Sequence, residues 1–532
     1  MKAQDRRLTV VLTIVWSITI LYGEMFAYWV PLCSCSWPSP PVNSTLMGGE
    51  GRVNHYSKLA VLTDPQLMDK TSLGVAPKSL ALETAQFYTD LYMRRAFFAS
   101  ILPFKPDVIL FLGDYFDGGP YLLEEEWQES LSRFKHIFGL NMLERHKDTP
   151  VYYLSGNHDI GYAGLNSRNP KVISRYEKEF GPRNFRFIAG EVEFIVVDAQ
   201  TVDGQGDSAS ATWDFAKNVS SDVQLRPRVL LTHIPLHRRD WTSCGPNRSS
   251  PVINQRITRA AQSQEIVYQN YITEESSNRL LELIKPVLIL SGHDHDQCTV
   301  IHELKSGIIK EQTVGTLSWQ MGNLYPSFML LSVSNSALGN TSTPEEAVIT
   351  QLCFLPMQMH IYIWYLLLFV LTLLAILFNG MGFWDRFTDM IRSSRELVSH
   401  NIFRGGTKEK DDDDDGEYEM IWDAEGSMHL VKKKVNAPVK HPVDKGFVER
   451  GNAVVRPTAK KNVSQEVEVC MNIDEVADMG VVPAFKLPHR TTKSRTKIII
   501  YRLIRAFQML AVIAAVNVPI YMMLLFKDWI DQ

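Results

Sequence analysis

Five short apolar runs in this sequence are each followed by side chains of the kinds that bind metal ions. The most informative run is residues 151–154, which leads into Asn157, His158 and Asp159. A brief apolar run bounded by turn residues is typical of a buried strand. The pattern recurs with Asp64 and Gln66 after residues 59–62, Asp114 after 108–112, His233 after 229–231, and His293 and His295 after 287–290.

These side chains are expected to converge, because open α/β sheets place their sites at the carboxyl ends of strands. One histidine in such a position is usually a hydrogen-bonded core residue. Four of them, together with carboxylates and an amide, favour a metal site instead. Oxygen and imidazole ligands suit manganese, iron or zinc, and the lack of clustered thiols argues against a structural zinc site.

In chain order the blocks read D-x-Q, G-D, G-N-H-D, a lone histidine and G-H-x-H. This order resembles the calcineurin-like metallophosphoesterase superfamily over roughly residues 58–333, with Gln66 where most members carry histidine. The resemblance implies an α/β fold, a four-layer αββα sandwich. The sequence itself adds helical patterns over 79–102, 123–138 and 274–284, and two polar insertions, 203–222 and 238–270, that either shape the substrate mouth or are plain loops.

The resemblance also implies roles for individual residues. Two divalent ions are expected, with manganese as the expected metal and iron or zinc as alternatives. One ion would take Asp64, Asp114, His295 and Gln66, and the other Asp114, Asn157, His233 and His293. Gln66 offers only a neutral carbonyl oxygen, so its role stays open. His158 would act on the transition state, and Asp159 would orient its ring; Asp117 reads as a loop carboxylate.

Three apolar segments are long enough to cross a bilayer: 8–30, 361–378 and 506–526. The first spans about 35 Å as a helix, and an uncleaved anchor is favoured over a cleavable signal peptide because the apolar part is long. Residues 31–57 read as a linker, 58–335 as the metallophosphoesterase domain, and 385–497, with an acidic run and a lysine cluster, as a largely disordered loop.

Positively charged residues near the span ends predict a cytosolic amino terminus, a cytosolic 385–497 loop and a lumenal catalytic domain. Four matches to the N-glycosylation pattern fall on the lumenal side, at Asn43, Asn218, Asn247 and Asn340. The net charge of −4 indicates no nucleic-acid partner. Six cysteines in 532 residues do not make a disulfide scaffold, and the sequence leaves their pairing open.

The strings around Asp64 and Asp114 resemble the subgroup that removes ethanolamine phosphate from a mannose of glycosylphosphatidylinositol (GPI) anchors. That resemblance implies a multi-pass enzyme of the endoplasmic reticulum or early Golgi, with GPI-anchored proteins as substrates and a role in their export. Two alternatives remain open. One is a lumenal phosphatase for lipid or nucleotide phosphates, and the other is a non-catalytic membrane scaffold or cargo receptor.

Overall fold

The computed structural model describes residues 3–39, 56–146, 149–166, 169–252, 257–304, 307–335, 347–379, 418–422, 428–432 and 495–530. The chain divides into two compact units, residues 1–381 with 499–532, and residues 382–498. In the second unit the described residues form an antiparallel hairpin, β14 (Tyr418–Trp422) with β15 (Met428–Lys432). The rest of the loop predicted over 385–497 lies outside the described residues, apart from the start of the last helix.

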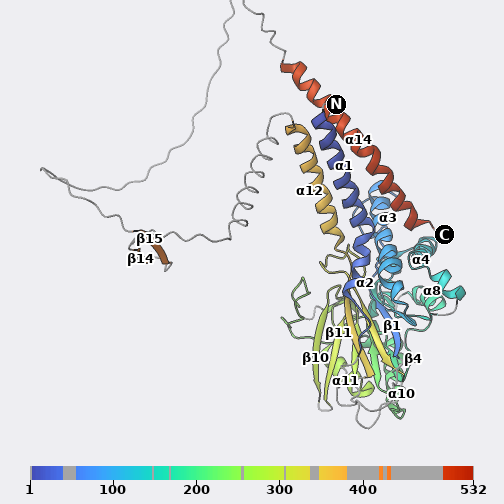
Figure 1. Cartoon of the computed structure of the whole chain (residues 1–532). Coiled ribbons are helices and arrows are strands. Elements are labelled where there is room, and N and C mark those ends of the chain that lie inside the picture. The colour runs from blue at the N-terminus through green and yellow to red at the C-terminus, as the bar shows by residue number, and fades with distance from the viewer. Residues whose placement is uncertain are drawn as a thin grey trace, which may run out of the picture. The chain divides into compact units, whose positions relative to one another are not determined.

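The catalytic half of the first unit contains two mixed sheets (Figure 1). One has the strand order β13-β12-β1-β2-β3, with β1, β2 and β3 parallel. Its strands are β1 (Tyr56–Leu62), β2 (Val108–Phe111), β3 (Val151–Tyr153), β12 (Ser327–Ser334) and β13 (Val348–Phe354). The other has the order β10-β11-β9-β6-β5-β4. Its strands are β4 (Phe185–Ala189), β5 (Val192–Val196), β6 (Arg228–Leu231), β9 (Leu288–Ser291), β10 (Cys298–Leu304) and β11 (Gly307–Thr313).

Three buried clusters show how the layers stack. Alternate residues of β1, such as Leu59 and Val61, pack between the two sheets against Phe194 and Val229 of the second. The intervening residues, such as Ala60, face α3 (Leu80–Arg95), η2 (Ala96–Ile101) and α4 (Glu124–Ile137). The second sheet's outer face packs on α10 (Asp207–Ser221) and α11 (Glu274–Ile284). The predicted αββα sandwich is therefore confirmed, since period-2 alternation buries both faces of each sheet.

Shorter elements complete the catalytic half. They are η3 (Leu102–Phe104), η4 (Gly119–Tyr121), α5 (Leu140–His146), α6 (Asn157–Ile160), α7 (Ala163–Asn166), α8 (Pro170–Phe180), α9 (Ala199–Val202), β7 (Ile257–Arg259) and β8 (Ile266–Gln269). The pair β7 and β8 forms a separate antiparallel hairpin.

Within the described ranges, three helices are long and apolar enough to cross a membrane: α1 (Ala3–Glu24), α12 (Gln358–Phe378) and α14 (Arg495–Trp529). They lie side by side in the first unit (Figure 1), with Trp16, Ile376 and Met509 in one apolar cluster. Polar contacts join them as well: Trp16 Nε1 donates to Thr372 Oγ1 at 3.0 Å, and Ser17 Oγ donates to Asn517 Oδ1 at 2.8 Å. In lipid, such contacts satisfy polar groups that would otherwise be unpaired.

The first predicted span, 8–30, is not one continuous helix. Helix α1 ends at Glu24, and the chain continues as η1 (Phe26–Trp29) and α2 (Val30–Ser34), with Pro31 in the first turn of α2. Glu24 pairs with Arg95 of α3, whose Nε also lies 2.8 Å from Asp528 Oδ2 near the end of α14. A buried carboxylate needs such a partner. This ion cluster attaches two membrane helices to the catalytic half.

One domain boundary differs from the sequence prediction, and the two polar insertions contain regular structure. The first sheet continues past residue 335 to β13, whose Cys353 forms a disulfide with Cys35. The insertion 203–222 contains α10, whose small buried residues Ala209, Ala216 and Val219 recur at helical spacing and escaped notice among polar neighbours. The insertion 238–270 contains the β7–β8 hairpin, and its Cys244 pairs with Cys298.

Candidate metal centre

The predicted ligands converge because their strands are parallel. Asp64 follows β1, Asp114 follows β2, and Asn157 begins α6 after β3. In the facing sheet, His233 follows β6, while His293 and His295 follow β9. β1, β2 and β3 run parallel to one another, as do β5, β6 and β9, so each set ends at one edge of its sheet. The site lies where these two edges meet.

Two groups of donor atoms share one carboxylate. The first comprises Asp114, His233 and His293, and the second comprises Asp64, Asp114 and His295. Within each group the ligand atoms lie within 4.8 Å of one another. Asp114 belongs to both groups, which is the geometry required of a residue that bridges two ions. The described residues therefore form a candidate dinuclear site.

The backbone at this site adopts unusual conformations. Ten described non-glycine residues have positive φ, and five of them are predicted ligands: Asp64, Gln66, Asp114, His293 and His295. The left-handed region costs free energy for residues with a Cβ, so it persists only where surrounding structure enforces it. Such strain clusters at functional sites, and here it turns the donor side chains toward one point.

Two glycines in the motifs allow the loops to approach each other. A Cβ added at Gly156 would lie 2.0 Å from Asp114 Oδ1, and one at Gly113 would lie 2.6 Å from His233 Nδ1. Gly113 also has a φ of +101°, which residues with side chains rarely adopt. Glycine is therefore required on steric grounds at the positions before Asp114 and Asn157, because a larger residue would collide with the neighbouring ligand loop.

The contacts of His233 indicate where a cation fits. Its Nδ1 lies 2.7 Å from the carbonyl oxygen of Leu112, so this nitrogen carries the proton of the neutral ring. Its Nε2 lies 3.1 Å from both Asn157 Oδ1 and Asp114 Oδ2, and all three atoms are then acceptors. Buried acceptors crowded together require a cation or a proton between them. Against the effect of burial, Asp114 raises the pKa of His233 to about 9.

In His293, the second histidine of this group, it is Nε2 and not Nδ1 that contacts a backbone carbonyl. His293 Nε2 lies 3.0 Å from the carbonyl oxygen of Gln269 and carries the ring proton. The unprotonated Nδ1 is therefore the nitrogen that can bind a metal ion. Burial and the neighbouring His233 lower the pKa of His293 to about 3, so its ring is neutral. A neutral imidazole oriented by a backbone carbonyl is the form that binds a metal.

The Asp64 group is more loosely assembled. His295 Nε2 lies 3.9 Å from Asp64 Oδ1, and Thr316 Oγ1 donates to the Asp64 carbonyl at 2.6 Å. Burial raises the pKa of Asp64, which means that its carboxylate lacks compensation from a cation. Gln66 donates through Nε2 to Asp114 Oδ2 at 3.2 Å, while its Oε1 is buried without a hydrogen-bond partner. The carboxylate oxygens of Asp64 and Asp114 and the unpaired Oε1 of Gln66 are oxygen ligands of the kind that bind a divalent cation.

The prediction that Asp159 orients the His158 ring is wrong. The Asp159 carboxylate instead accepts backbone hydrogen bonds from Asp114 (2.8 Å), Tyr115 (2.8 Å) and Gly156 (2.9 Å), and so ties two ligand loops together. Three or more backbone donors outcompete one ring for a buried carboxylate. Asp159 positions the site, because it fixes the backbone on both sides of Asp114.

His158 is oriented by Asp117, which the sequence indicated to be an ordinary loop carboxylate. Its Nδ1 donates to the Asp117 carbonyl oxygen and lies 3.6 Å from Asp117 Oδ1. The side chain is 36% exposed, in contrast to the fully buried His233. Against burial, Asp114 and Asp117 raise the pKa of His158. With Nδ1 occupied, Nε2 is the nitrogen available to exchange a proton with a substrate.

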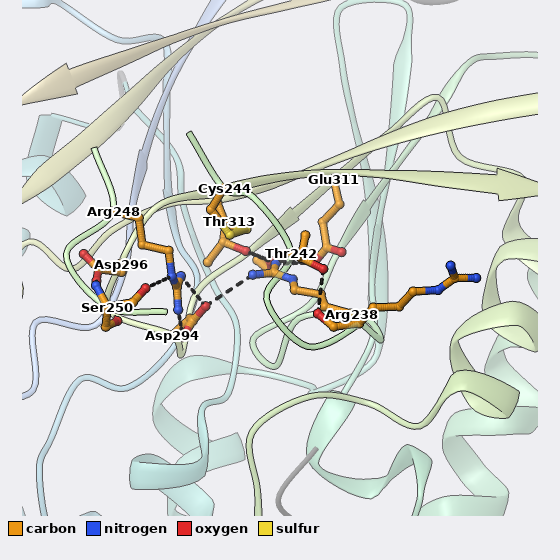
Figure 2. Close-up of a disulfide and its surroundings, with 12 residues drawn as sticks. Arg238, Thr242, Cys244, Arg248, Ser250, Asp294, Asp296, Glu311 and Thr313 are labelled. Carbon is orange, nitrogen blue, oxygen red and sulfur yellow. Dashed lines mark hydrogen bonds and ion pairs between the residues drawn. A yellow bond between two sulfur atoms is a disulfide. The ribbon is translucent and has the colours of Figure 1, made fainter. Parts of the chain in front are cut away.

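Figure 2 shows a second charged cluster, which contains Asp294, Arg238, Arg248 and Glu311. Asp294 lies between His293 and His295 in sequence, and its Oδ2 is 3.2 Å from Arg238 Nη1 and 2.7 Å from Arg248 Nη1. Arg238 also reaches Glu311 at 3.2 Å. The Cys244–Cys298 disulfide holds the segment carrying Arg248 beside the loop that contains Asp294. Sequence reasoning missed both arginines, since they lie in an insertion without a recognisable motif.

The predicted glycosylation sites have different positions. Asn218 is exposed on α10, and Asn247 is half-buried in the segment after β6. Asn43 and Asn340 lie outside the described residues.

Comparisons with known proteins agree with the geometry. The profile of the family described as calcineurin-like phosphoesterase matches residues 58–297. Cell division control protein 1 of Saccharomyces cerevisiae is 29% identical, with 66% of this chain and 71% of that protein covered. Metallophosphoesterase 1 of Rattus norvegicus is 28% identical, covering 65% and 86% respectively. The purple acid phosphatase PPD1 from yellow lupin seeds aligns at 13% identity and a TM-score of 0.33, over 53% of this chain and 50% of that one, a likeness too slight for argument.

The matched residues include both groups of donor atoms that contain Asp114. The scaffold alternative is set aside, because the chain has the family's domain together with converging donors for a dinuclear site. This chain is a metal-dependent phosphoesterase with a calcineurin-like phosphoesterase domain at residues 58–297.

Proposed function

We propose that this protein is a lumenal phosphodiesterase that removes ethanolamine phosphate from a mannose of GPI anchors and thereby aids export of GPI-anchored proteins. The observation that carries the proposal is the attachment of the catalytic half, which contains the candidate metal centre, to the membrane helices. Arg95 of the catalytic half contacts Glu24 of α1 and Asp528 of α14, and Tyr92 donates to the Pro356 carbonyl at 2.8 Å, just before α12. The identity of the glycan rests on the motif resemblance.

A fixed position beside the bilayer favours a membrane-held substrate. Enzyme and substrate then meet in two dimensions, which raises their effective concentration without new contacts. This reasoning favours a lipid-linked phosphoester over a nucleotide, which would diffuse freely in the lumen.

The proposed residues divide into three tasks. Asp64, Gln66, Asp114, Asn157, His233, His293 and His295 would hold two divalent ions, and manganese is the proposed metal. When bound, such ions offset the phosphate charge and lower the pKa of water. His158 Nε2 would donate a proton to the alcohol oxygen that leaves phosphorus, since Asp117 holds its other nitrogen. Asp159 would keep the Asp114 and Asn157 loops in register.

The lumenal orientation receives support from the cysteines. Both described disulfides, Cys35–Cys353 and Cys244–Cys298, belong to the part proposed to face the lumen. Disulfides persist in the secretory pathway and are rare in the cytosol. Protease added to sealed microsomes should therefore cut within residues 385–497 and spare 58–333. Endoglycosidase treatment should shift the mobility of the full chain through Asn218 or another of the four candidates. Cleavage of the catalytic half in sealed vesicles would reverse the orientation.

The deciding experiment is mass analysis of GPI glycans from cells that lack this protein. We expect one additional ethanolamine phosphate per glycan, and slower surface arrival of GPI-anchored proteins while other cargo travels normally. Re-expression of the wild-type chain should remove the extra group, and re-expression of Asp114→Asn should not. Unchanged glycans, combined with activity of the purified protein on a lipid or nucleotide phosphate, would establish the alternative phosphatase.

A further inference from the structure

A groove of about 930 Å³ lies between the catalytic half and the membrane helices. Its volume falls within the usual range for small-molecule sites, about 300–1,000 Å³. Five parts of the chain line it: the segment after β1, helix α3, the β11–β12 loop, and the membrane helices α12 and α14. The lining residues are Met68, Leu73, Leu80, Ala81, Thr84, Ala85, Tyr88, Thr89, Trp319, Gln320, Tyr362, Tyr365 and Tyr521.

One wall of the groove is aromatic and belongs partly to the membrane helices. The Tyr362 ring, in the first turns of α12, lies 5.7 Å from that of Trp319 and 6.5 Å from that of Tyr88. The hydroxyl of Tyr521, near the end of α14, lies 3.2 Å from that of Tyr88. Tyrosine and tryptophan are enriched where membrane helices meet the interface. The groove therefore begins where these helices join the catalytic half.

The rim of the groove is apolar and open. Leu80, at the start of α3, is 80% exposed, and Leu73 is 37% exposed. An exposed leucine that lies next to membrane helices gains free energy by contact with lipid. Lipid can thus reach the groove from the side, without passing through water.

The other end of the groove adjoins the metal centre. Gln320 Nε2 donates to the carbonyl oxygen of Gln66 at 2.8 Å. Met68, two residues beyond Gln66, is also part of the lining. A molecule in the groove consequently touches the same short segment that carries the first predicted ligands.

Two polar atoms of the lining residues have no partner. Trp319 Nε1 and Gln320 Oε1 are both buried, and neither makes a hydrogen bond. Buried polar groups in folded proteins almost always have partners, so orphaned ones indicate a missing ligand or water. The indole nitrogen is a donor and the amide oxygen an acceptor. Together they suit hydroxyl and phosphate oxygens at the junction between an acyl chain and its headgroup.

We propose that this groove receives an acyl chain of a lipid-linked phosphoester, and that Trp319 and Gln320 bind the polar atoms where its headgroup begins. The proposal rests on the proposed function in one respect, that the metal centre hydrolyses a membrane-held phosphoester. It adds a lateral route from the bilayer to that centre, and it makes the lipid portion of the substrate part of what the enzyme recognises.

The test places the full chain and its variants in phosphatidylcholine nanodiscs and measures hydrolysis of two substrates, one lipid-linked and one soluble. Ala85→Trp fills the groove, and Ala81→Trp narrows its rim; neither residue belongs to the metal centre. Ala211→Trp, on the exposed face of α10, is the matched control. We expect kcat/KM for a GPI glycolipid carrying ethanolamine phosphate to fall by at least about tenfold in the two groove variants. Turnover of soluble bis(p-nitrophenyl) phosphate should stay within about twofold of wild type, which also shows that the variants fold.

Equal activity of Ala85→Trp, Ala81→Trp and Ala211→Trp on the glycolipid would overturn the groove proposal. A cross-linking experiment decides the question if the wild type does not hydrolyse that glycolipid at all, or if Ala85→Trp does not fold. In it, phosphatidylinositol with a photoactivatable acyl chain is placed in phosphatidylcholine vesicles. The label should attach to residues 80–89 of the wild type and Ala211→Trp, and should be lost in Ala81→Trp. Labelling confined to the apolar faces of α12 and α14 would contradict the proposal.

Discussion

Two groups of buried or half-buried carboxylates in this protein are balanced in different ways. Around Asp294 and Glu311, the chain supplies its own cations, Arg238 and Arg248 (Figure 2). Around Asp64 and Asp114, the described residues provide histidines but no lysine or arginine partner. A buried charge without a counter-charge costs several kcal/mol. The group around Asp294 and Glu311 thus contains its own arginines, whereas the group around Asp64 and Asp114 must be balanced by a proton on His233 or by a bound cation.

The largest expected effect is at the carboxylate shared by both donor groups. Asp114→Asn removes the one charge that both ions would share, so metal and activity should be lost together. Metal analysis and phosphodiesterase turnover of the purified variant measure this. Asp222→Asn, which breaks only an exposed ion pair with Arg186, is the control and should behave as wild type. Full metal content with normal turnover in Asp114→Asn would refute the shared-ligand assignment.

The next effect separates catalysis from metal binding. His158→Ala should keep its metal, because the ring contacts Asp117 rather than the donor groups, while turnover falls by roughly 10²–10⁴-fold. Metal analysis and turnover of the same preparation provide both values. Loss of metal in this variant would instead make His158 a ligand.

Substitutions in the group around Asp294 and Glu311 should lower the stability of the fold rather than its metal content. Arg238→Met removes the arginine partner of the buried Glu311 and leaves it His302 at 2.7 Å, which should cost about 3–5 kcal/mol. Arg186→Met removes an arginine that is 47% exposed and should cost at most about 1 kcal/mol. Melting temperatures in detergent compare the two, and metal per folded chain should stay unchanged in both. Equal melting of the two variants would show that the Arg238 contacts add no stability.

The smallest expected effect concerns Gln66. Gln66→His installs the residue that most members of the family carry, and histidine tolerates the positive φ at this position. Imidazole is a better ligand than an amide oxygen, so the variant should hold metal roughly tenfold more tightly, about 1.4 kcal/mol. Competition with a chelator measures this retention. Weaker retention than wild type would show that the Gln66 amide is already the better fit.

The comparison also explains which features the sequence could predict. Asp64, Asp114, His233 and His293 were predictable because each follows a buried strand, and parallel strands bring such ends together. Arg238 and Arg248 were not, since they reach Asp294 from an insertion whose path depends on a disulfide and on tertiary contacts. Motifs report residues fixed by strand ends, whereas residues delivered by long insertions have no regular spacing.

The functions of Asp117 and Asp159 show the same limit at shorter range. Both lie within motif loops, yet the ring of His158 contacts Asp117 and not its sequence neighbour. The carboxylate of Asp159 turns toward backbone amides of the Asp114 loop, which is distant in sequence. Adjacency in sequence therefore predicted the wrong partner, because the α6 turn directs successive side chains to different neighbours.

The central claim is that Asp64 and Asp114, two carboxylates without a lysine or arginine partner among the described residues, hold two metal ions. Elemental analysis of the purified full-length protein, after dialysis against metal-free buffer, tests this most directly. The account predicts about two divalent ions per chain, manganese foremost, and near-complete loss in Asp114→Asn. A protein that hydrolyses phosphodiesters with no bound metal, or that keeps its full metal content in Asp114→Asn, would contradict the account.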